Sequence, residues 1–407
     1  MMTTSFIERY AKVFGRPSSL LLKLSGLEAF ENEGRGSLVI DTNQRTLLDF
    51  GSFGIHLLGH CHPEIIHVVR QQITRMNLST KTLANEAALL AAEKLSQLKG
   101  GDRNGVIFGN SGSEAIEITL KMCRIATGRK KFIALRHSYH GRTDGALQLS
   151  DGYYQHAAAP EQRMTCFYDA DDIAGIAERL AQCDVAAVYV EPVQGEGGIR
   201  PVAPEHMQEI YKLCQDHGTR YISDEIQSGL GRSGHLLSAP WADAVVVGKT
   251  LAGGIYPISA VIFDNQKFGN AARDPIISAS SYAGGALAGA VACKVLDIVS
   301  APGFIETINQ HGNLLQRLLN KTLSSHASIV AIRGAGLMIG IEFCDAHMCG
   351  EVVLEAIANN LIVSFCLSTP QVLRIYPPAV ATPQEIQLAV DILSQAISTA
   401  WQLKNNE

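Results

Sequence analysis

The pattern that most constrains the fold is an alternation of short apolar, β-branched runs with longer helical patterns. The apolar runs are Val106–Phe108, Phe132–Leu135, Ala186–Val190, Tyr221–Ser223, Ala244–Val247 and Ile258–Phe263. The helical patterns between them include Ser113–Ala126, Ile173–Gln182 and Pro204–His217. Continuously apolar strands that alternate with helices are typical of a parallel sheet covered on both faces. We therefore predict an α/β fold with a large, mostly parallel sheet over about residues 78–301.

The chain length and the flanking regions predict a second, smaller domain. A chain of 407 residues is too long for one ordinary hydrophobic core. Residues Arg35–Asp49 have the pattern of a hairpin around Thr42-Asn43-Gln44. The C-terminal region has a long helical pattern, then strand patterns at Ile329–Arg333, Gly336–Phe343 and Val372–Tyr376, and a final helix from about Pro383. We expect an N-terminal segment, 1–77, that joins a C-terminal α+β domain, 302–407, beside the large domain, 78–301.

Charge and cysteine usage exclude several classes of protein. The net charge is −5 and no long basic run occurs, so we expect no nucleic-acid partner. The nine cysteines include no Cys-x-x-Cys pair, which predicts free thiols in a reducing compartment such as the cytoplasm. No stretch approaches the roughly 20 apolar residues that span a membrane, so we expect no membrane partner. His60 and His62 could suggest a metal, but a Gly-His loop before a helix opened by Pro63 is the better interpretation, and we predict no metal site.

Small residues after the first predicted strand of the large sheet suggest an anion site. The segment Gly109-Asn110-Ser111-Gly112-Ser113-Glu114-Ala115 follows Val106–Phe108 and opens a helix. Backbone N–H groups and the helix dipole at such a position favour a phosphate. The alternative is an ordinary turn in which a serine caps the helix.

A carboxylate and a lysine follow two other predicted strands. Asp224 comes directly after Tyr221–Ser223, and Lys249 comes just after Ala244–Val247. A lysine at the end of an apolar strand is partly desolvated, which lowers its pKa and allows a neutral amine to form a Schiff base. The alternative is a lysine whose ammonium group reaches water. Together, a phosphate seat, a carboxylate for a pyridinium nitrogen and an imine-forming amine are what pyridoxal 5′-phosphate requires.

An ordered set of motifs along nearly the whole chain resembles one known family. In chain order the motifs are Gly59-His60-Cys61-His62-Pro63, Ser111-Gly112-Ser113-Glu114-Ala115, His140-Gly141-Arg142-Thr143, Glu191-Pro192-Val193-Gln194-Gly195-Glu196-Gly197-Gly198, Asp224-Glu225-Ile226-Gln227, Gly231-Arg232-Ser233-Gly234, Gly248-Lys249, and Arg374 before Pro377-Pro378. The chain is similar to the class III (ω-type) aminotransferases of fold type I, which depend on pyridoxal 5′-phosphate. Within them it looks most like the putrescine, acetylornithine and ornithine branch.

The resemblance implies roles for the residues around the cofactor. Lys249 is expected to form an imine with pyridoxal phosphate and to shuttle the proton, and Asp224 is expected to pair with the pyridine nitrogen. Four further residues are implied to bind the cofactor: Gln227 at the ring hydroxyl, Tyr139 on the ring face, and Gly112 and Ser113 at the phosphate.

Three charged residues match positions that contact substrate in this family. Arg374 matches an arginine that clamps the α-carboxylate of glutamate or 2-oxoglutarate, because a planar guanidinium suits a carboxylate. Glu196 matches the glutamate that pairs with that arginine when an amine without a carboxylate binds. Arg142 matches a second substrate-contacting arginine. The alternative for each is a surface ion pair.

The segment Ser280–Leu287 departs from the family pattern. Ser281 stands where a threonine usually reaches the phosphate of the neighbouring subunit, and Ser280 precedes it in the substrate-binding stretch. Since Ser281 keeps the hydroxyl, the resemblance implies a homodimer with shared active sites. Phe53 stands where some ornithine enzymes have a tyrosine that contacts substrate, which weakens an ornithine assignment.

We therefore expect an aminotransferase that moves the amino group of a primary amine, a diamine or an ω-amino acid, to 2-oxoglutarate or another keto acid. Acetylornithine or ornithine aminotransferase is the closest alternative. A pyridoxal-phosphate-dependent aminomutase of the same fold is a more distant one, since the Gln194-Gly195-Glu196 region resembles it poorly. A noncatalytic nucleotide-binding protein would leave Asp224 and Lys249 without a purpose.

Overall fold

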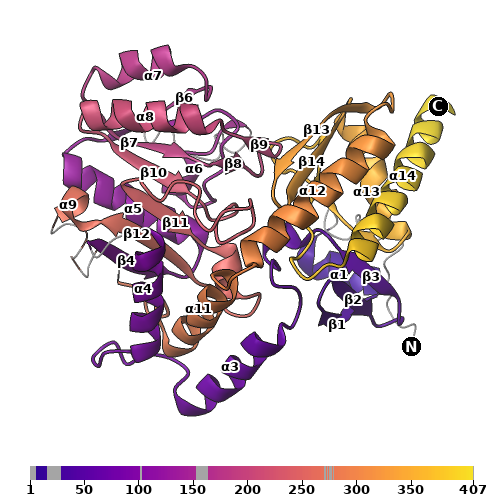
Figure 1. The fold of residues 1–407 in the computed structure, drawn as a ribbon, viewed down its shortest axis with the longest axis horizontal. Helices are drawn as coiled ribbons and strands as arrows, with labels where there is room; N and C mark the ends of the chain where they lie inside the picture. Colours follow the sequence, from indigo (N-terminus) through magenta and orange to yellow (C-terminus); the bar gives the residue numbers. More distant parts are fainter. Residues whose placement is uncertain are drawn as a thin grey trace.

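A seven-stranded sheet forms the centre of the larger part of the molecule (Figure 1). The computed structural model describes residues 6–15, 29–100, 103–152, 164–269, 272, 274, 277 and 279–406. The strand order is β4 (Asn104–Gly109), β12 (Ser259–Asp264), β11 (Ala244–Val247), β10 (Arg220–Asp224), β7 (Val185–Val190), β5 (Lys131–Leu135) and β6 (Thr165–Tyr168). All neighbouring pairs are parallel except those of β12, which runs antiparallel to both β11 and β4.

Helices cover both faces of this sheet, as the apolar strands predict. Side chains of α4 (Glu86–Leu98), α7 (Ile173–Leu180), α8 (Pro204–Asp216) and α11 (Ala286–Val299) form one core with alternate strand residues. Side chains of α5 (Gly112–Thr127), α6 (Asp144–Leu147) and α9 (Asn265–Phe268) form the core on the opposite face. Val245 and Val247 face the first core, whereas Ala244 and Val246 face the second. The α/β prediction is therefore confirmed, with one antiparallel strand in a mostly parallel sheet.

A smaller body joins the C-terminal region to the N-terminal strands. The antiparallel sheet β13 (Ile329–Ala335), β14 (Met338–Phe343), β17 (Val372–Ile375) and β16 (Ser364–Phe365) packs with α12 (Phe304–Leu323), α13 (Ala346–Ala358) and α14 (Pro383–Asn406). A second sheet has the order β1 (Glu31–Arg35), β2 (Leu38–Asp41), β3 (Thr46–Asp49) and β15 (Leu361–Ile362). The predicted hairpin is confirmed as β2 and β3, which pair antiparallel from Leu38–Leu48 to Ile40–Thr46.

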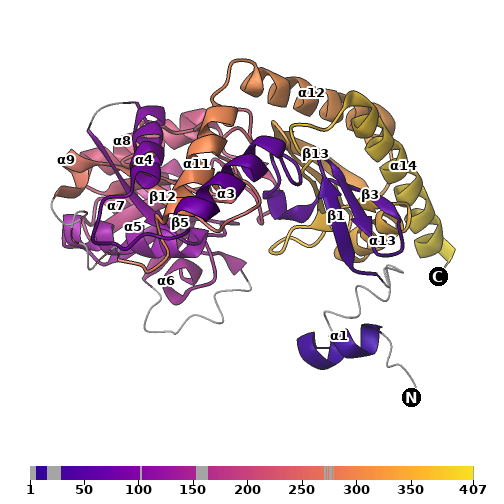
Figure 2. The same cartoon turned by 90° about the horizontal axis from the view of Figure 1, so that it is seen from below.

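The N-terminal part of the chain contributes to both bodies. β15 pairs in parallel with β3, so the N-terminal strands and the C-terminal region share a sheet. Helix α3 (Pro63–Arg75) instead places Ile65 against Leu287 and Val291 of α11, on the side of the large sheet. Helix α1 (Phe6–Phe14) has no buried residue and stands apart from the main body in Figure 2. The division at residues 78 and 302 stays a prediction.

The helices were also compared with the length of a membrane span. Within the described ranges, no single helix is both long and apolar enough to cross a membrane. Helices α11 and α12 meet the length and composition test only as a pair, and the pair is bent by 69°.

Candidate active site

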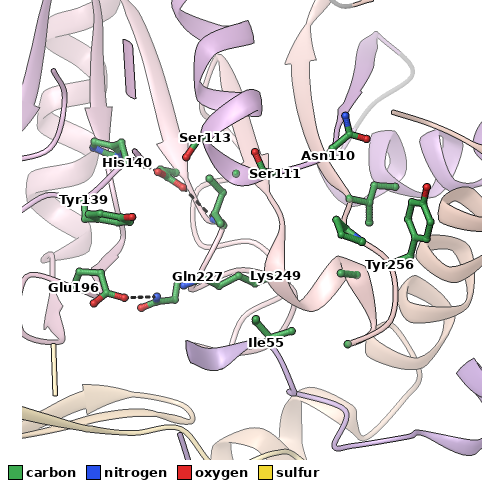
Figure 3. A pocket seen from close by; sticks show the side chains of 18 of the residues that line it. Ile55, Asn110, Ser111, Ser113, Tyr139, His140, Glu196, Gln227, Lys249 and Tyr256 are labelled. Atoms are coloured by element: carbon green, nitrogen blue, oxygen red, sulfur yellow. Dashed lines mark hydrogen bonds and ion pairs between the residues drawn. The ribbon is translucent and has the colours of Figure 1, made fainter. Parts of the chain in front are cut away.

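A cavity of about 420 Å³ lies where three parallel strands of the large sheet end. After β4 the chain contributes Asn110, Ser111, Gly112 and Ser113, after β10 Asp224 and Gln227, and after β11 Lys249. The carboxyl ends of parallel strands meet at one edge of a sheet, which is the usual ligand site of an open α/β fold. Figure 3 shows Glu196, Gln227 and Lys249 on one side of the cavity and Asn110 and Tyr256 on the other.

Lys249 opens the short 3₁₀ helix η4 (Lys249–Ala252) and lines the cavity. Burial lowers the pKa of its amine to about 8, and this effect outweighs the nearby carboxylate of Glu196, which acts in the opposite direction. Its backbone φ of 36° lies in the left-handed region, which costs energy for a residue with a side chain. Strain of this kind persists only where the surroundings fix the residue, and here it points the amine into the cavity.

Asp224, at the end of β10, is 4% exposed and belongs to a network of buried charges. Its Oδ2 lies 2.6 Å from Nδ1 of His140, and its Oδ1 accepts a hydrogen bond of 3.1 Å from the backbone of Ile226. Burial alone would lower the pKa of His140, but the hydrogen bond and charge of Asp224 raise it above its ordinary value. Asp224 therefore favours the protonated form of the His140 ring, and both residues line the cavity.

Glu191 stands behind this pair, and no role was expected for it. It is buried, and burial raises its pKa to about 8, although the positive charge of His140 acts in the opposite direction. Its carboxyl oxygens accept hydrogen bonds from the backbone N–H of Tyr139, at 2.7 Å, and of Gly195, at 3.2 Å. Glu191 thereby fixes the two segments that carry Tyr139 and Glu196 into the cavity.

The start of α5 has the properties expected of an anion site. Ser111 caps the helix, with Oγ accepting from the backbone of Glu114 at 3.2 Å. Gly112 has no side chain to obstruct this point, and a Cβ there would lie 2.9 Å from Ile226. Ser113 lines the cavity, and its Oγ accepts from the backbone of Arg142 at 3.1 Å. The helix dipole and the first N–H groups of a 16-residue helix therefore face the cavity.

Tyr139 and Arg142 lie on the adjoining wall. Tyr139 lines the cavity, and Nε of Arg142 donates to its hydroxyl at 3.2 Å. The side chain of Arg142 is exposed and lies outside the residues that line the cavity. The substrate contact predicted for Arg142 therefore has no support in the structure of one chain.

Glu196, which lines the cavity, forms a buried ion pair with Arg374, which is not among the cavity-lining residues. Nη1 of Arg374 lies 2.5 Å from Oε1 of Glu196, and both side chains are almost fully buried. Burial would raise the pKa of Glu196, but the charges of Arg374 and Lys249 lower it. The alternative interpretation of an exposed surface pair is wrong for these two residues. Arg374 also donates from Nε to Oγ of Ser364 at 2.9 Å, while its Nη2 is buried and has no hydrogen-bond partner among the described residues.

Gln227 connects this pair to the centre of the cavity. Its Nε2 lies 3.5 Å from Oε1 of Glu196, and its Oε1 accepts from the hydroxyl of Tyr376 at 2.7 Å. A Cβ at Gly195 would lie 1.6 Å from Oε1 of Gln227, so only glycine fits beside it. The orientation of Gln227 is thus fixed by groups from three separate segments.

The structure does not bring Ser280 and Ser281 to the cavity of their own chain. Both line a separate hollow with Lys81 and Phe108. Ser280 is linked to the main cavity only indirectly, because its Oγ accepts from Nδ2 of Asn110 at 2.8 Å.

Sequence reasoning left several functional residues without a role. His140 stands in a quoted motif, directly after Tyr139, and that position was the available signal. Glu191 opens another quoted motif. Ile55 and Tyr376 lie in runs that resemble the putrescine branch, but no role was assigned to them. The wall residue Tyr256 gave no signal, because an isolated apolar residue in a sequence is more often part of the core.

The cavity fits the cofactor that the sequence predicts. A desolvated lysine, a buried carboxylate paired with a histidine, and a capped helix N-terminus converge on one space. These are an imine-forming amine, an anionic partner for a pyridinium nitrogen and a seat for a phosphate.

Comparisons with known proteins agree with this geometry. A family model described as aminotransferase class-III matches residues 25–397. An acetylornithine aminotransferase from Methanosarcina acetivorans is 31% identical over 410 residues, which cover 97% of this chain and 100% of that protein. An ornithine aminotransferase from Staphylococcus aureus is 32% identical over 374 residues, which cover 88% of this chain and 92% of that protein. A solved ornithine aminotransferase from Toxoplasma gondii has a TM-score of 0.86 and 27% identity, covers 99% of this chain and 100% of that one, and has partial occupancy of pyridoxal phosphate at its active site.

Proposed function

Because this chain belongs to the class III aminotransferases, which depend on pyridoxal 5′-phosphate, we propose that its amino donor is a terminal primary amine, on a diamine or an ω-amino acid, and its acceptor 2-oxoglutarate or another keto acid. The fold is type I of the pyridoxal-phosphate-dependent transferases, and the substrates of an aminotransferase are an amine and a keto acid. When bound, the cofactor withdraws electrons from the carbon that carries the amino group.

The residues around the cavity divide the work of holding the cofactor and moving protons. Lys249 would hold the cofactor covalently, and its Nζ would take up and return the proton at the reacting carbon. Asp224, positioned by its 2.6 Å contact with His140, would hold a proton on the pyridine nitrogen. The remaining contacts would come from Gly112 and Ser113 at the phosphate, Tyr139 on the ring face and Gln227 at the ring hydroxyl.

The buried pair of Glu196 and Arg374 is the observation that carries the donor assignment. An unpaired buried arginine is costly, and it would attract any carboxylate that enters the cavity. With Glu196 paired to it, the wall is neutral and accepts an amine that has no carboxylate at this end. When Glu196 moves aside, the planar fork of Arg374 is free to bind the α-carboxylate of a keto acid.

Glu196→Gln should slow the amine half-reaction and leave the glutamate half-reaction unchanged or faster, because the side chain that neutralises Arg374 loses its charge. Arg374→Lys should act in the opposite direction and raise the KM for the keto acid, because a bidentate clamp becomes a point charge. We expect about tenfold or more for each main effect, as for the loss of one partner of a buried charged hydrogen bond. Single-turnover rates of the two half-reactions measure both effects.

The matched control is Glu342→Gln, which removes the glutamate of another Arg–Glu pair, that of Arg333 and Glu342 on β13 and β14. Glu342→Gln should have the same small effect on the single-turnover rates of both half-reactions. Equal effects of Glu196→Gln on the two half-reactions would show that Glu196 is only structural.

A second candidate donor is acetylornithine or ornithine, which the names of the similar proteins favour. Both molecules donate a terminal amine and carry a carboxylate at the other end, so they also fit the general proposal. Formation of the pyridoxamine form with putrescine, an ω-amino acid, ornithine and acetylornithine ranks the donors. Net consumption of an added keto acid excludes an aminomutase.

The active unit should be a homodimer with shared sites, since the hydroxyl of Ser281 would then reach the partner's cavity. Apolar side chains exposed on α3, α4 and the neighbouring loops support such an interface: Ile73, Met76, Leu83, Leu89 and Tyr282. These side chains would lose contact with water in a dimer. Sedimentation should give twice the chain mass, and a fully active monomer would contradict the proposal.

A further inference from the structure

The conformation and exposure of Phe53 are not explained by the stability of the folded protein. It lies in the 3₁₀ turn η1 (Ser52–Gly54), and its side chain is 50% exposed. The φ angles of Ser52 and Phe53 are 44° and 52°, in the left-handed region that non-glycine residues avoid. A strained backbone that presents a half-exposed aromatic ring costs stability twice, and such strain is concentrated at functional sites.

The surroundings hold this turn in place against the strain. Asp49 accepts hydrogen bonds from the backbone of Gly51 at 2.9 Å and from the hydroxyl of Ser52, and its Oδ2 lies 2.7 Å from Nε2 of His60. Beyond Phe53, the carbonyl of Gly54 accepts from the buried guanidinium of Arg232 at 3.4 Å. Both ends of the turn are therefore fixed, and so is the position of the ring.

The ring of Phe53 lies against the guanidinium of Arg374. The distance from Cζ of Arg374 to the ring centroid is 4.5 Å, within the range of a cation–π contact. Arg374 is only 1% exposed although Phe53 is half exposed, so the ring lies between the charge and water. The second aromatic neighbour, Tyr376, has its ring centroid 5.9 Å away.

We propose that Phe53 is a positioning residue that holds the guanidinium plane of Arg374 while Arg374 binds a substrate carboxylate. This rests on the proposed function, in which Glu196 leaves Arg374 when the keto acid arrives. In the masked state Glu196 holds Arg374 through the 2.5 Å pair, and the backbone of Leu367 holds Glu196 at 3.0 Å. Once Glu196 moves aside, Arg374 keeps its contacts with the Ser364 hydroxyl, the Phe53 ring and the more distant Tyr376 ring.

The proposal therefore predicts an effect that is confined to carboxylate binding. Phe53→Leu keeps an apolar side chain but removes the aromatic face, and Phe53→Tyr keeps that face. Glutarate, an unreactive dicarboxylate, serves as the probe, and its Kd for the holoenzyme is measured by calorimetry. We expect Phe53→Leu to weaken glutarate binding about 5- to 20-fold, as for the loss of a largely desolvated cation–π contact. Phe53→Tyr should change the Kd less than about twofold.

Steady-state and single-turnover rates distinguish a role in carboxylate binding from a purely structural role. Phe53→Leu should raise the KM for the keto acid with little change in kcat, and leave the single-turnover rate of the amine half-reaction within about twofold. Phe30→Leu is the matched control, because Phe30 is 54% exposed and packs on Phe6 of α1 instead of the cavity. Phe30→Leu should change neither the Kd for glutarate nor the KM for the keto acid. Phe53→Met provides the same test if the leucine variant is not recovered in folded form.

The outcomes separate this proposal from the one on which it rests. If Phe53→Leu binds glutarate as tightly as the unaltered protein while Glu196→Gln still separates the two half-reactions, the role of Phe53 is wrong and the proposed function stands. If Phe53→Leu slows both half-reactions equally, Phe53 only supports the fold. If Glu196→Gln fails to separate the half-reactions, the proposed function itself fails.

Discussion

Replacing Lys249 with alanine should abolish transamination and remove the covalent bond to the cofactor that borohydride reduces. The amine of Lys249 has a pKa lowered to about 8 by burial, so far more of it is neutral near pH 7 than in an ordinary lysine. A neutral amine is the form that reacts with an aldehyde, and in the described part of the chain Lys249 is the lysine that lines the cavity. Turnover is measured with a donor and a keto acid, and the bond by mass spectrometry after borohydride treatment.

The matched control for this loss is Lys99→Ala. Lys99 is 8% exposed and burial lowers its pKa as well, but it follows α4 and lies outside the cavity-lining residues. This variant should keep the borohydride-reducible bond and most of the activity. Turnover of Lys249→Ala at the rate of the unaltered protein would show that another group performs its chemistry.

Replacing Asp224 with alanine should leave the fold intact and lower the rate by on the order of 10²-fold or more, comparable to removing one preorganised electrostatic stabiliser. Asp224 is the carboxylate that a cofactor nitrogen would meet at the end of β10, and Nδ1 of His140 lies 2.6 Å from its Oδ2. Without this charge, a proton on the pyridine nitrogen loses its stabilising partner. The rate of each half-reaction measures the effect, and circular dichroism checks the fold.

Two further variants separate charge from structure at this position. Asp224→Asn keeps the shape of the side chain and should lose nearly as much activity as alanine. Glu225→Gln alters the adjacent buried carboxyl, which accepts hydrogen bonds from the backbone N–H groups of Ser238 and Ala239 and from the Ser223 hydroxyl, and should retain activity wherever the protein folds. An Asp224 variant within a few-fold of the unaltered rate would contradict the assigned role.

Local sequence signals were sufficient for much of the fold and for the centre of the site. Periodicity identified the strands that became β4, β5, β7, β10, β11 and β12, because burial on both faces of a sheet demands continuous apolar runs. The positions of Asp224 and Lys249 followed from the same pattern, since residues just beyond parallel strands meet at one edge. Each of these inferences depends on residues that are neighbours in the chain.

The direction of β12 is an example of what local signals could not determine. The run Ile258–Phe263 was expected as a strand of a mostly parallel sheet, yet the strand it forms, β12, runs antiparallel to both of its neighbours. A parallel return needs a crossover connection long enough to pass over the sheet, usually a helix. The link from Val247 to Ser259 contains only the short 3₁₀ helix η4, so the chain returns in the opposite direction.

Tertiary structure alone decided the electrostatics of the site. His140 and Asp224 are 84 positions apart, and Glu196 and Arg374 are 178 positions apart. The sequence supplied the residue types, and for Glu196 and Arg374 the resemblance supplied the pairing, but neither determined burial. Burial raises the pKa of Glu191 and lowers that of Lys249, the contact with Asp224 raises that of His140, and packing places the ring of Phe53 over Arg374. Burial depends on how distant segments pack together, and that information is spread over the whole chain instead of any one stretch of it.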